Sequence, residues 1–216
     1  MLALAAIVPQ GHSSITAVTM SFPRANDVMN PRISAELRPD RKVTDMKVDE
    51  TVTVPADALR AFVTGLFVAA DVDSGEAGHV SGSLVESNLC GHESHGVIRV
   101  TEYMGYLKTG ALKAGVDLKI MSRTASTIVC DAQLGFGQTQ VQRLVEIIAP
   151  MAADQGVACG TIRRCGHVGR LGEWVERLAR RDLAALMMVN DNGVLMCVAP
   201  PGGIDARIST NPVAFG

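Results

Sequence analysis

A histidine, an arginine and a tyrosine recur at four-residue intervals in one segment of the chain, as His95, Arg99 and Tyr103. In a helix that opens near Ser94, side chains four residues apart lie on one face. An imidazole titrates near neutral pH, and a guanidinium holds a carboxylate through two parallel hydrogen bonds. The spacing therefore predicts a site that holds an anionic substrate and moves a proton.

The elements that would position these three side chains are helical. Apolar residues recur at helical spacing in the first part of the chain, and a glycine that could end the last helix follows as Gly110. The range 49–112 is therefore predicted to form a helical domain. Its expected helices span 55–70, 76–89 and, carrying the three side chains, about 94–108.

From residue 113 onward the pattern changes to strands that alternate with helices. The range 113–216 is predicted to be an α/β domain with a mixed sheet, incomplete at its C-terminus because residues 213–216 start a strand with an unpaired edge. Pro150 should kink or end the first helix of this domain. Strands are expected over 116–121, 126–130, 157–163, 183–189 and 194–198, and helices over 141–151 and 171–181.

Composition and charge exclude several classes of protein. The formal net charge of −2 argues against a nucleic-acid partner or a basic membrane-binding face. No apolar run is long enough for a membrane span. Five cysteines without CxxC spacing argue against a disulfide framework or a structural zinc site, and they favour a cytoplasmic location. Residues 1–48 show no period and are interpreted as a disordered extension or a mis-assigned start, with Met46 as the alternative first residue.

Four motifs, in order along the chain, resemble the malate/L-lactate/ureidoglycolate dehydrogenase family, the type-2 group without a Rossmann fold. The third motif is closest to the hydroxycarboxylate dehydrogenase B branch. The motifs are Gly91-His92-Glu93-Ser94-His95-Gly96 with Arg99 and Tyr103, Gly135-Phe136-Gly137-Gln138, Gly166-His167-Val168-Gly169-Arg170-Leu171-Gly172-Glu173-Trp174, and Ser209-Thr210-Asn211-Pro212.

This resemblance implies an enzyme that transfers a hydride between NAD or NADP and a small 2-hydroxy or 2-oxo carboxylic acid, such as malate or lactate. It also implies a helical domain joined to a nucleotide-binding α/β domain, and a homodimer when the protein is full length. Members of the family continue well beyond the Asn-Pro motif. The absence of a GxGxxG sequence agrees with a nucleotide domain that is not a Rossmann fold.

The resemblance also implies roles for individual residues. His95 would contact the cofactor beside the substrate, and His167 would exchange the proton, so both are expected to be catalytic and to converge on one pocket. The residues expected to bind the substrate are Arg99, Tyr103 and Ser94. The residues expected to bind the cofactor are His95, Gly169, Arg170, Leu171, Thr210 and Asn211. Two departures from the family pattern stand out: Cys90 replaces a common arginine, and Asn190-Asp191-Asn192 replaces small hydroxyl residues.

Two alternatives to an active dehydrogenase follow from the same residues. A zinc hydrolase would need two histidines at i and i+4, but His92 and His95 are three residues apart with no evident third ligand, so no metal site is expected. A catalytically inactive fragment that acts as a binding or interaction module is the second alternative, and the abrupt end of the chain favours it. Trp174 is expected to be a core residue rather than a cofactor platform.

Overall fold

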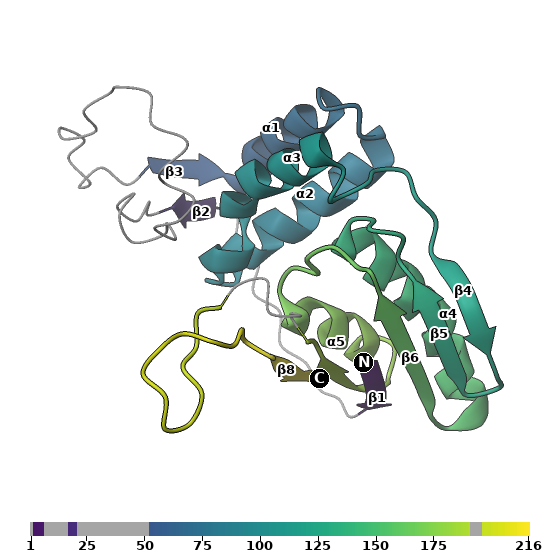
Figure 1. The fold of residues 1–216 in the computed structure, drawn as a ribbon. Helices are drawn as coiled ribbons and strands as arrows, with labels where there is room; N and C mark the ends of the chain where they lie inside the picture. The colour runs from purple at the N-terminus through teal and green to yellow at the C-terminus, as the bar shows by residue number, and fades with distance from the viewer. Residues whose placement is uncertain (1, 7–16, 21–51, 191–195) are drawn as a thin grey trace.

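The computed structural model describes residues 2–6, 17–20, 52–190 and 196–216, with backbone alone for the first two ranges. A layer of helices lies above a sheet that carries two further helices (Figure 1). This mixed α/β architecture confirms the fold class expected from the sequence. None of the helices in these ranges combines the length and apolar character needed to cross a membrane.

The upper layer contains three α-helices and two short 3-10 turns. They are α1 (Ala56–Val68), α2 (Ser74–Leu89), η1 (Glu93–His95), η2 (Val97–Arg99) and α3 (Val100–Thr109). The carboxylate of Asp73 caps α2 by accepting hydrogen bonds from the amides of Gly75 and Glu76. Apolar side chains from all three helices form one core, which includes Leu59, Val63, Phe67, Val80, Leu84 and Tyr103.

The lower layer is a six-stranded mixed sheet in the order β4-β5-β6-β1-β7-β8. Strands β5 and β6 are parallel, and the other neighbouring pairs are antiparallel. A β-hairpin is formed separately by β2 and β3. The strands are β1 (Leu2–Ala6), β2 (Ala17–Met20), β3 (Val52–Pro55), β4 (Lys119–Arg123), β5 (Thr127–Asp131), β6 (Ala158–Arg163), β7 (Ala184–Met188) and β8 (Val213–Phe215).

Helices α4 (Gly137–Gln155) and α5 (Leu171–Ala179) pack on the sheet and form its core with it. Trp174 on α5 is only 1% exposed, so the expected core position of this residue is confirmed. The core also includes Ile128, Leu144, Ile148, Val175 and Leu178. Burying a large apolar side chain contributes about 1.5–3 kcal/mol, so this core anchors the two ends of the loop between β6 and α5.

Two local expectations differ from the structure. Pro150 neither ends nor visibly divides α4, because the helix continues with buried Met151 and stops only at Gly156, which adopts a left-handed backbone at φ 77°. Strands β1 and β2 lie within the range 1–48, which was expected to lack order. The other residues of the range 1–48 lie outside the described residues. The same holds for residues 194 and 195, which begin the strand expected over 194–198.

Candidate active site

The imidazoles of His95 and His167 meet where the two layers come together. His95 belongs to η1 in the helical layer, and His167 lies in the loop between β6 and α5. Their ring centroids are 5.0 Å apart and the rings are tilted by 35°. The ring of His92 lies 4.6 Å from that of His95. The structure therefore brings the two histidines together, as the sequence analysis expected.

Close packing between glycines fixes the backbone at His167. A Cβ atom on Gly137, at the start of α4, would lie 2.3 Å from the carbonyl oxygens of Gly166 and His167. No side chain is compatible with that distance, so glycine is required there. On the other side of the loop, the indole nitrogen of Trp174 donates to the carbonyl oxygen of Val168 at 2.9 Å. The backbone that carries His167 is thus held between α4 and α5.

The segment that carries His95 is not the single helix expected over 94–108. Gly96 has an extended backbone and separates η1 from η2, and α3 begins only at Val100. A Cβ atom on Gly96 would lie 2.2 Å from Oδ1 of Asn88, and the same oxygen accepts a hydrogen bond from the amide of Val97. This contact with α2 breaks the helix, so His95 does not share a helical face with the residues that follow.

Burial lowers the pKa of both histidines. The pKa of His167 falls to about 4, mainly because burial disfavours its charged form, with a further contribution from the positive charge of Arg99. The pKa of His95 also falls to about 4, through burial first and then through the nearby His167, His92 and Arg99. Both imidazoles are therefore neutral at pH 7, and each presents one donor and one acceptor nitrogen.

Arg99 and Ser94, both expected to bind substrate, border the histidine pair. The guanidinium of Arg99 donates from Nε to the carbonyl oxygen of Ser94 at 2.6 Å and from Nη1 to the Glu102 carboxylate at 2.7 Å. These bonds fix the orientation of the guanidinium plane. The hydroxyl of Ser94 lies 2.9 Å from Nδ1 of His95, so Ser94 orients that ring in this structure.

Tyr103 departs from its expected position beside a substrate carboxylate. Its side chain is only 2% exposed, and its ring packs among Phe67 and Phe136. The hydroxyl lies 2.7 Å from Nδ1 of His167 and accepts a hydrogen bond from Nε2 of Gln138 at 2.9 Å. Tyr103 therefore lies behind His167 in the interior. Gln138 ends the Gly-Phe-Gly-Gln motif, which the sequence marked only as a glycine-rich turn and not as a partner of Tyr103.

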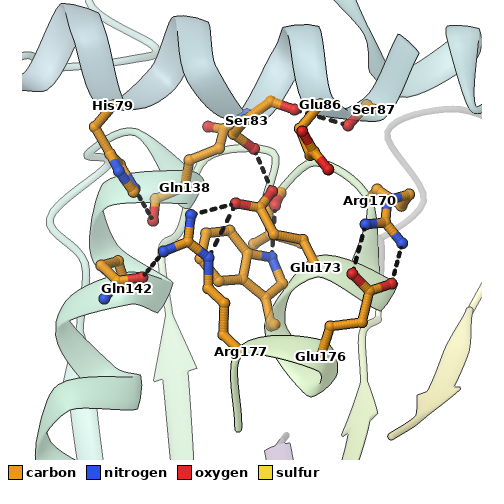
Figure 2. A network of polar contacts seen from close by, with 12 residues as sticks. His79, Ser83, Glu86, Ser87, Gln138, Gln142, Arg170, Glu173, Glu176 and Arg177 are labelled. Carbon is orange, nitrogen blue, oxygen red and sulfur yellow. Dashed lines mark hydrogen bonds and ion pairs between the residues drawn. The ribbon is translucent and has the colours of Figure 1, made fainter. Parts of the chain in front are cut away.

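The segment from Gly169 to Leu171 forms the turn into α5. Gly169 has a left-handed backbone at φ 74°, and α5 begins at Leu171 with no side-chain cap on its first amides. The guanidinium of Arg170 is held by the Glu176 carboxylate through two bonds of 2.7 and 3.1 Å (Figure 2). Its Nε is buried without a partner among the described residues. Uncapped amides at a helix start and a buried cationic donor suit a phosphate group.

A surface hollow of about 610 Å³ lies beside this turn, between α2 and α5. Both acidic and basic side chains line it: Glu86, Arg170, Glu173, Glu176, Arg177 and Arg180. Sequence reasoning missed Glu173, which is 5% exposed and joins the two layers. Its carboxylate accepts a hydrogen bond from the Ser83 hydroxyl of α2 at 2.5 Å and pairs with Arg177 at 2.8 Å (Figure 2).

The remaining candidates come from other segments of the chain. Thr210 and Asn211 are exposed just before β8, beside the end of β7, where the amide of Val189 donates to the carbonyl oxygen of Pro212. Asp191 and Asn192 lie outside the described residues. Cys90 is exposed at the end of α2. Within the described ranges, no group of three or more His, Cys, Asp or Glu side chains is arranged to hold a metal ion.

Comparison with known proteins identifies the relatives of this arrangement. A family model described as malate/L-lactate dehydrogenase matches residues 54–216. The chain belongs to the malate/L-lactate dehydrogenase family. That assignment confirms the resemblance seen in the four motifs, and the matched range contains both histidines and the turn into α5.

Individual members of the malate/L-lactate dehydrogenase family agree with this assignment. Hydroxycarboxylate dehydrogenase B of Escherichia coli O157:H7 is 29% identical over 157 residues, covering 73% of this chain and 43% of that protein. The malate dehydrogenase structure from Pyrococcus horikoshii OT3 superposes with a TM-score of 0.71 at 28% identity, covering 75% of this chain and 46% of that one. L-sulfolactate dehydrogenase of Methanocaldococcus jannaschii is 31% identical over 61% of this chain and 37% of that protein. The chain thus spans less than half the length of these relatives.

Proposed function

We propose that this chain carries the proton-exchanging and nucleotide-binding residues of an NAD- or NADP-dependent 2-hydroxy acid dehydrogenase. The observation that supports it most is the meeting of His95 and His167 at 5.0 Å beside the guanidinium of Arg99. Membership of the malate/L-lactate dehydrogenase family supports the same reaction class. The names of the relatives point to malate, lactate, sulfolactate or a similar acid as the substrate.

The residues of the turn into α5 fit a nicotinamide nucleotide. The uncapped amides of α5, the left-handed Gly169 and the buried guanidinium of Arg170 would bind its phosphate groups. His95 would contact the nicotinamide end, and Thr210 and Asn211 would add contacts from the segment before β8. When bound, the nucleotide supplies or accepts the hydride at C2 of the acid.

The protein itself must orient the acid and exchange one proton. Arg99 would hold the substrate carboxylate with the part of its guanidinium that faces away from Glu102, and Ser94 would support the same end of the substrate. His167 would exchange the proton with the oxygen on C2, which is the role that imidazole most often takes in proton transfer. Its partly buried position disfavours the charged form of the ring.

The protein is proposed to act in the cytoplasm as a homodimer. The five cysteines are all free thiols, which agrees with a reducing compartment. Size-exclusion chromatography with light scattering tests the homodimer: a dimeric mass supports it and a monomeric mass contradicts it.

Nucleotide binding and turnover by this chain test the proposed function. The chain is titrated with NADH and with NADPH, and oxidation of the nucleotide is followed with pyruvate and with oxaloacetate. Binding with turnover supports the dehydrogenase, and His167→Gln should then lower the rate by about two to four powers of ten, the usual loss for a general acid–base. Binding without turnover supports the alternative of a binding module. The absence of binding to either nucleotide contradicts the proposed dehydrogenase.

A further inference from the structure

A chain of buried polar groups leads from α4 to His167 and is not used by the proton exchange proposed above. Nε2 of Gln138 donates to the Tyr103 hydroxyl at 2.9 Å, and that hydroxyl lies 2.7 Å from Nδ1 of His167. Gln138 is fully buried, and Tyr103 is 2% exposed. Gln138 lies at the start of α4, close to Ser83 of α2 (Figure 2). Water therefore does not compete for these bonds.

The donor and acceptor roles fix the direction of this chain. An amide nitrogen can only donate, so the Tyr103 oxygen accepts from Gln138. Burial raises the pKa of the Tyr103 hydroxyl, so it keeps its proton. A buried hydroxyl needs an acceptor, and Nδ1 of His167 lies 2.7 Å away, so we infer that this proton is directed at a lone pair on Nδ1. Because His167 is neutral at pH 7, its single ring proton lies on Nε2.

The opposite direction would send the Tyr103 proton away from His167, and the Gln138 carbonyl oxygen could accept it only if the amide were turned over. Its Oε1 is buried without a partner among the described residues. Turning the amide would place an NH₂ group with two donors in that position, and buried donors are left unpaired more rarely than buried carbonyl oxygens. The arrangement with one unpaired acceptor is therefore the less costly of the two.

We propose that Tyr103, oriented by Gln138, is a positioning residue that holds His167 as the Nε2–H tautomer, ready to donate a hydrogen bond to the C2 oxygen of a 2-oxo acid. This inference rests on the proposed function. Nε2 is on the side of the imidazole ring away from Tyr103. A ketone oxygen only accepts hydrogen bonds, so it matches this N–H, whereas removal of a hydroxyl proton needs a lone pair at Nε2. The resting site is thus set to bind the 2-oxo acid through this N–H. For the proton to be transferred to the C2 oxygen, the ring must also gain a proton at Nδ1, because loss of the proton from the neutral ring would leave an imidazolate.

The tautomer can be measured directly in the free protein. Long-range proton–nitrogen NMR spectra of the imidazoles at pH 7 distinguish a protonated ring nitrogen from one that carries a lone pair. The chain has five histidines, so His167→Gln assigns the signal by its loss. The proposal expects one dominant form of His167 with the proton on Nε2. A dominant Nδ1–H form, or a comparable mixture in the unmodified chain, overturns it.

Two tyrosine variants separate positioning from general support of the fold. Tyr103→Phe removes the hydroxyl donor, so both tautomers of His167 should appear. Tyr106→Phe is the matched control, because Tyr106 is also on α3 but donates to Glu102, and it should leave the tautomer unchanged. An unchanged tautomer in a folded Tyr103→Phe variant contradicts the proposal. If that variant does not fold, the tautomer of His167 in the unmodified chain still tests the proposal.

These spectra need neither nucleotide nor acid, so they separate this inference from the proposed function. A chain that shows the Nε2–H form but binds no nucleotide contradicts the proposed function alone. A chain that binds the nucleotide but shows the Nδ1–H form contradicts only the positioning role of Tyr103.

Discussion

The imidazoles of His95 and His167 lie 5.0 Å apart although one belongs to a 3-10 turn of the helical layer and the other to a loop of the sheet layer. Their proximity depends on the junction between the layers, where the Ser83 hydroxyl of α2 donates to the Glu173 carboxylate of α5. The site is therefore expected to respond to changes in that junction as well as to changes in the rings.

The two partly buried histidines should make stability depend on pH below neutrality. Each has a pKa of about 4 in the folded chain, against an ordinary value near 6.5 in the unfolded chain. Between about pH 6.5 and 4 the unfolded chain binds protons that the folded chain does not. The free energy of unfolding should therefore fall as the pH falls through this window, with little contribution from these groups above it.

Urea unfolding at pH 7 and pH 5 measures this dependence. The double variant His95→Gln with His167→Gln should show a smaller fall in the unfolding midpoint between the two pH values than the unmodified chain does. Equal falls in both proteins would show that other groups cause the pH dependence.

The hydrogen bond from Ser83 to Glu173 should contribute measurably to stability. Ser83→Ala leaves one side of a buried carboxylate without its donor, and hydrogen bonds to charged groups contribute about 1.5–3 kcal/mol. Ser81→Ala is the matched control, because Ser81 is also buried on α2 but donates to the Ala77 carbonyl within its own helix. Chemical unfolding should show the larger loss for Ser83→Ala, and a loss no larger than that of the control would contradict the account.

Gly137 should tolerate no side chain. In Gly137→Ala the new methyl group would displace the backbone of Gly166 and His167, and overpacking of this kind costs about 1–3 kcal/mol. Gly78→Ala on α2, where a Cβ atom meets nothing within 4 Å, should instead be neutral or stabilising. Thermal unfolding compares the two variants, and a shift of the His167 ring signals is expected only for Gly137→Ala. A fully stable Gly137→Ala variant with unmoved His167 signals would disprove the packing argument.

Much of the fold and part of the site could be predicted from the sequence. Apolar spacing located the helices α1, α2, α4 and α5, and the motifs marked His95 and His167. The helix expected to begin near Ser94 was wrong, because the contact of Gly96 with Asn88 is a tertiary constraint that helical spacing does not contain. The burial of Tyr103 could not be predicted from helical spacing either, because the residues that surround it come from distant segments of the chain.

Arg170 should contribute to nucleotide affinity if the proposed function holds. Loss of a charged donor costs about 1.5–3 kcal/mol, so Arg170→Ala should weaken binding of NADH or NADPH by about tenfold to a hundredfold. Arg180→Ala is the matched control, because this side chain lines the same hollow but is 69% exposed. Calorimetric titration compares the two, and equal affinities for both variants would remove Arg170 from the site.

The most direct test of the shared site follows the ring signals of His95 and His167 in one NMR titration with NADH or NADPH. If both rings line one nucleotide site, both signals shift together and saturate at the same nucleotide concentration. A nucleotide that binds while both signals stay in place would contradict the shared site.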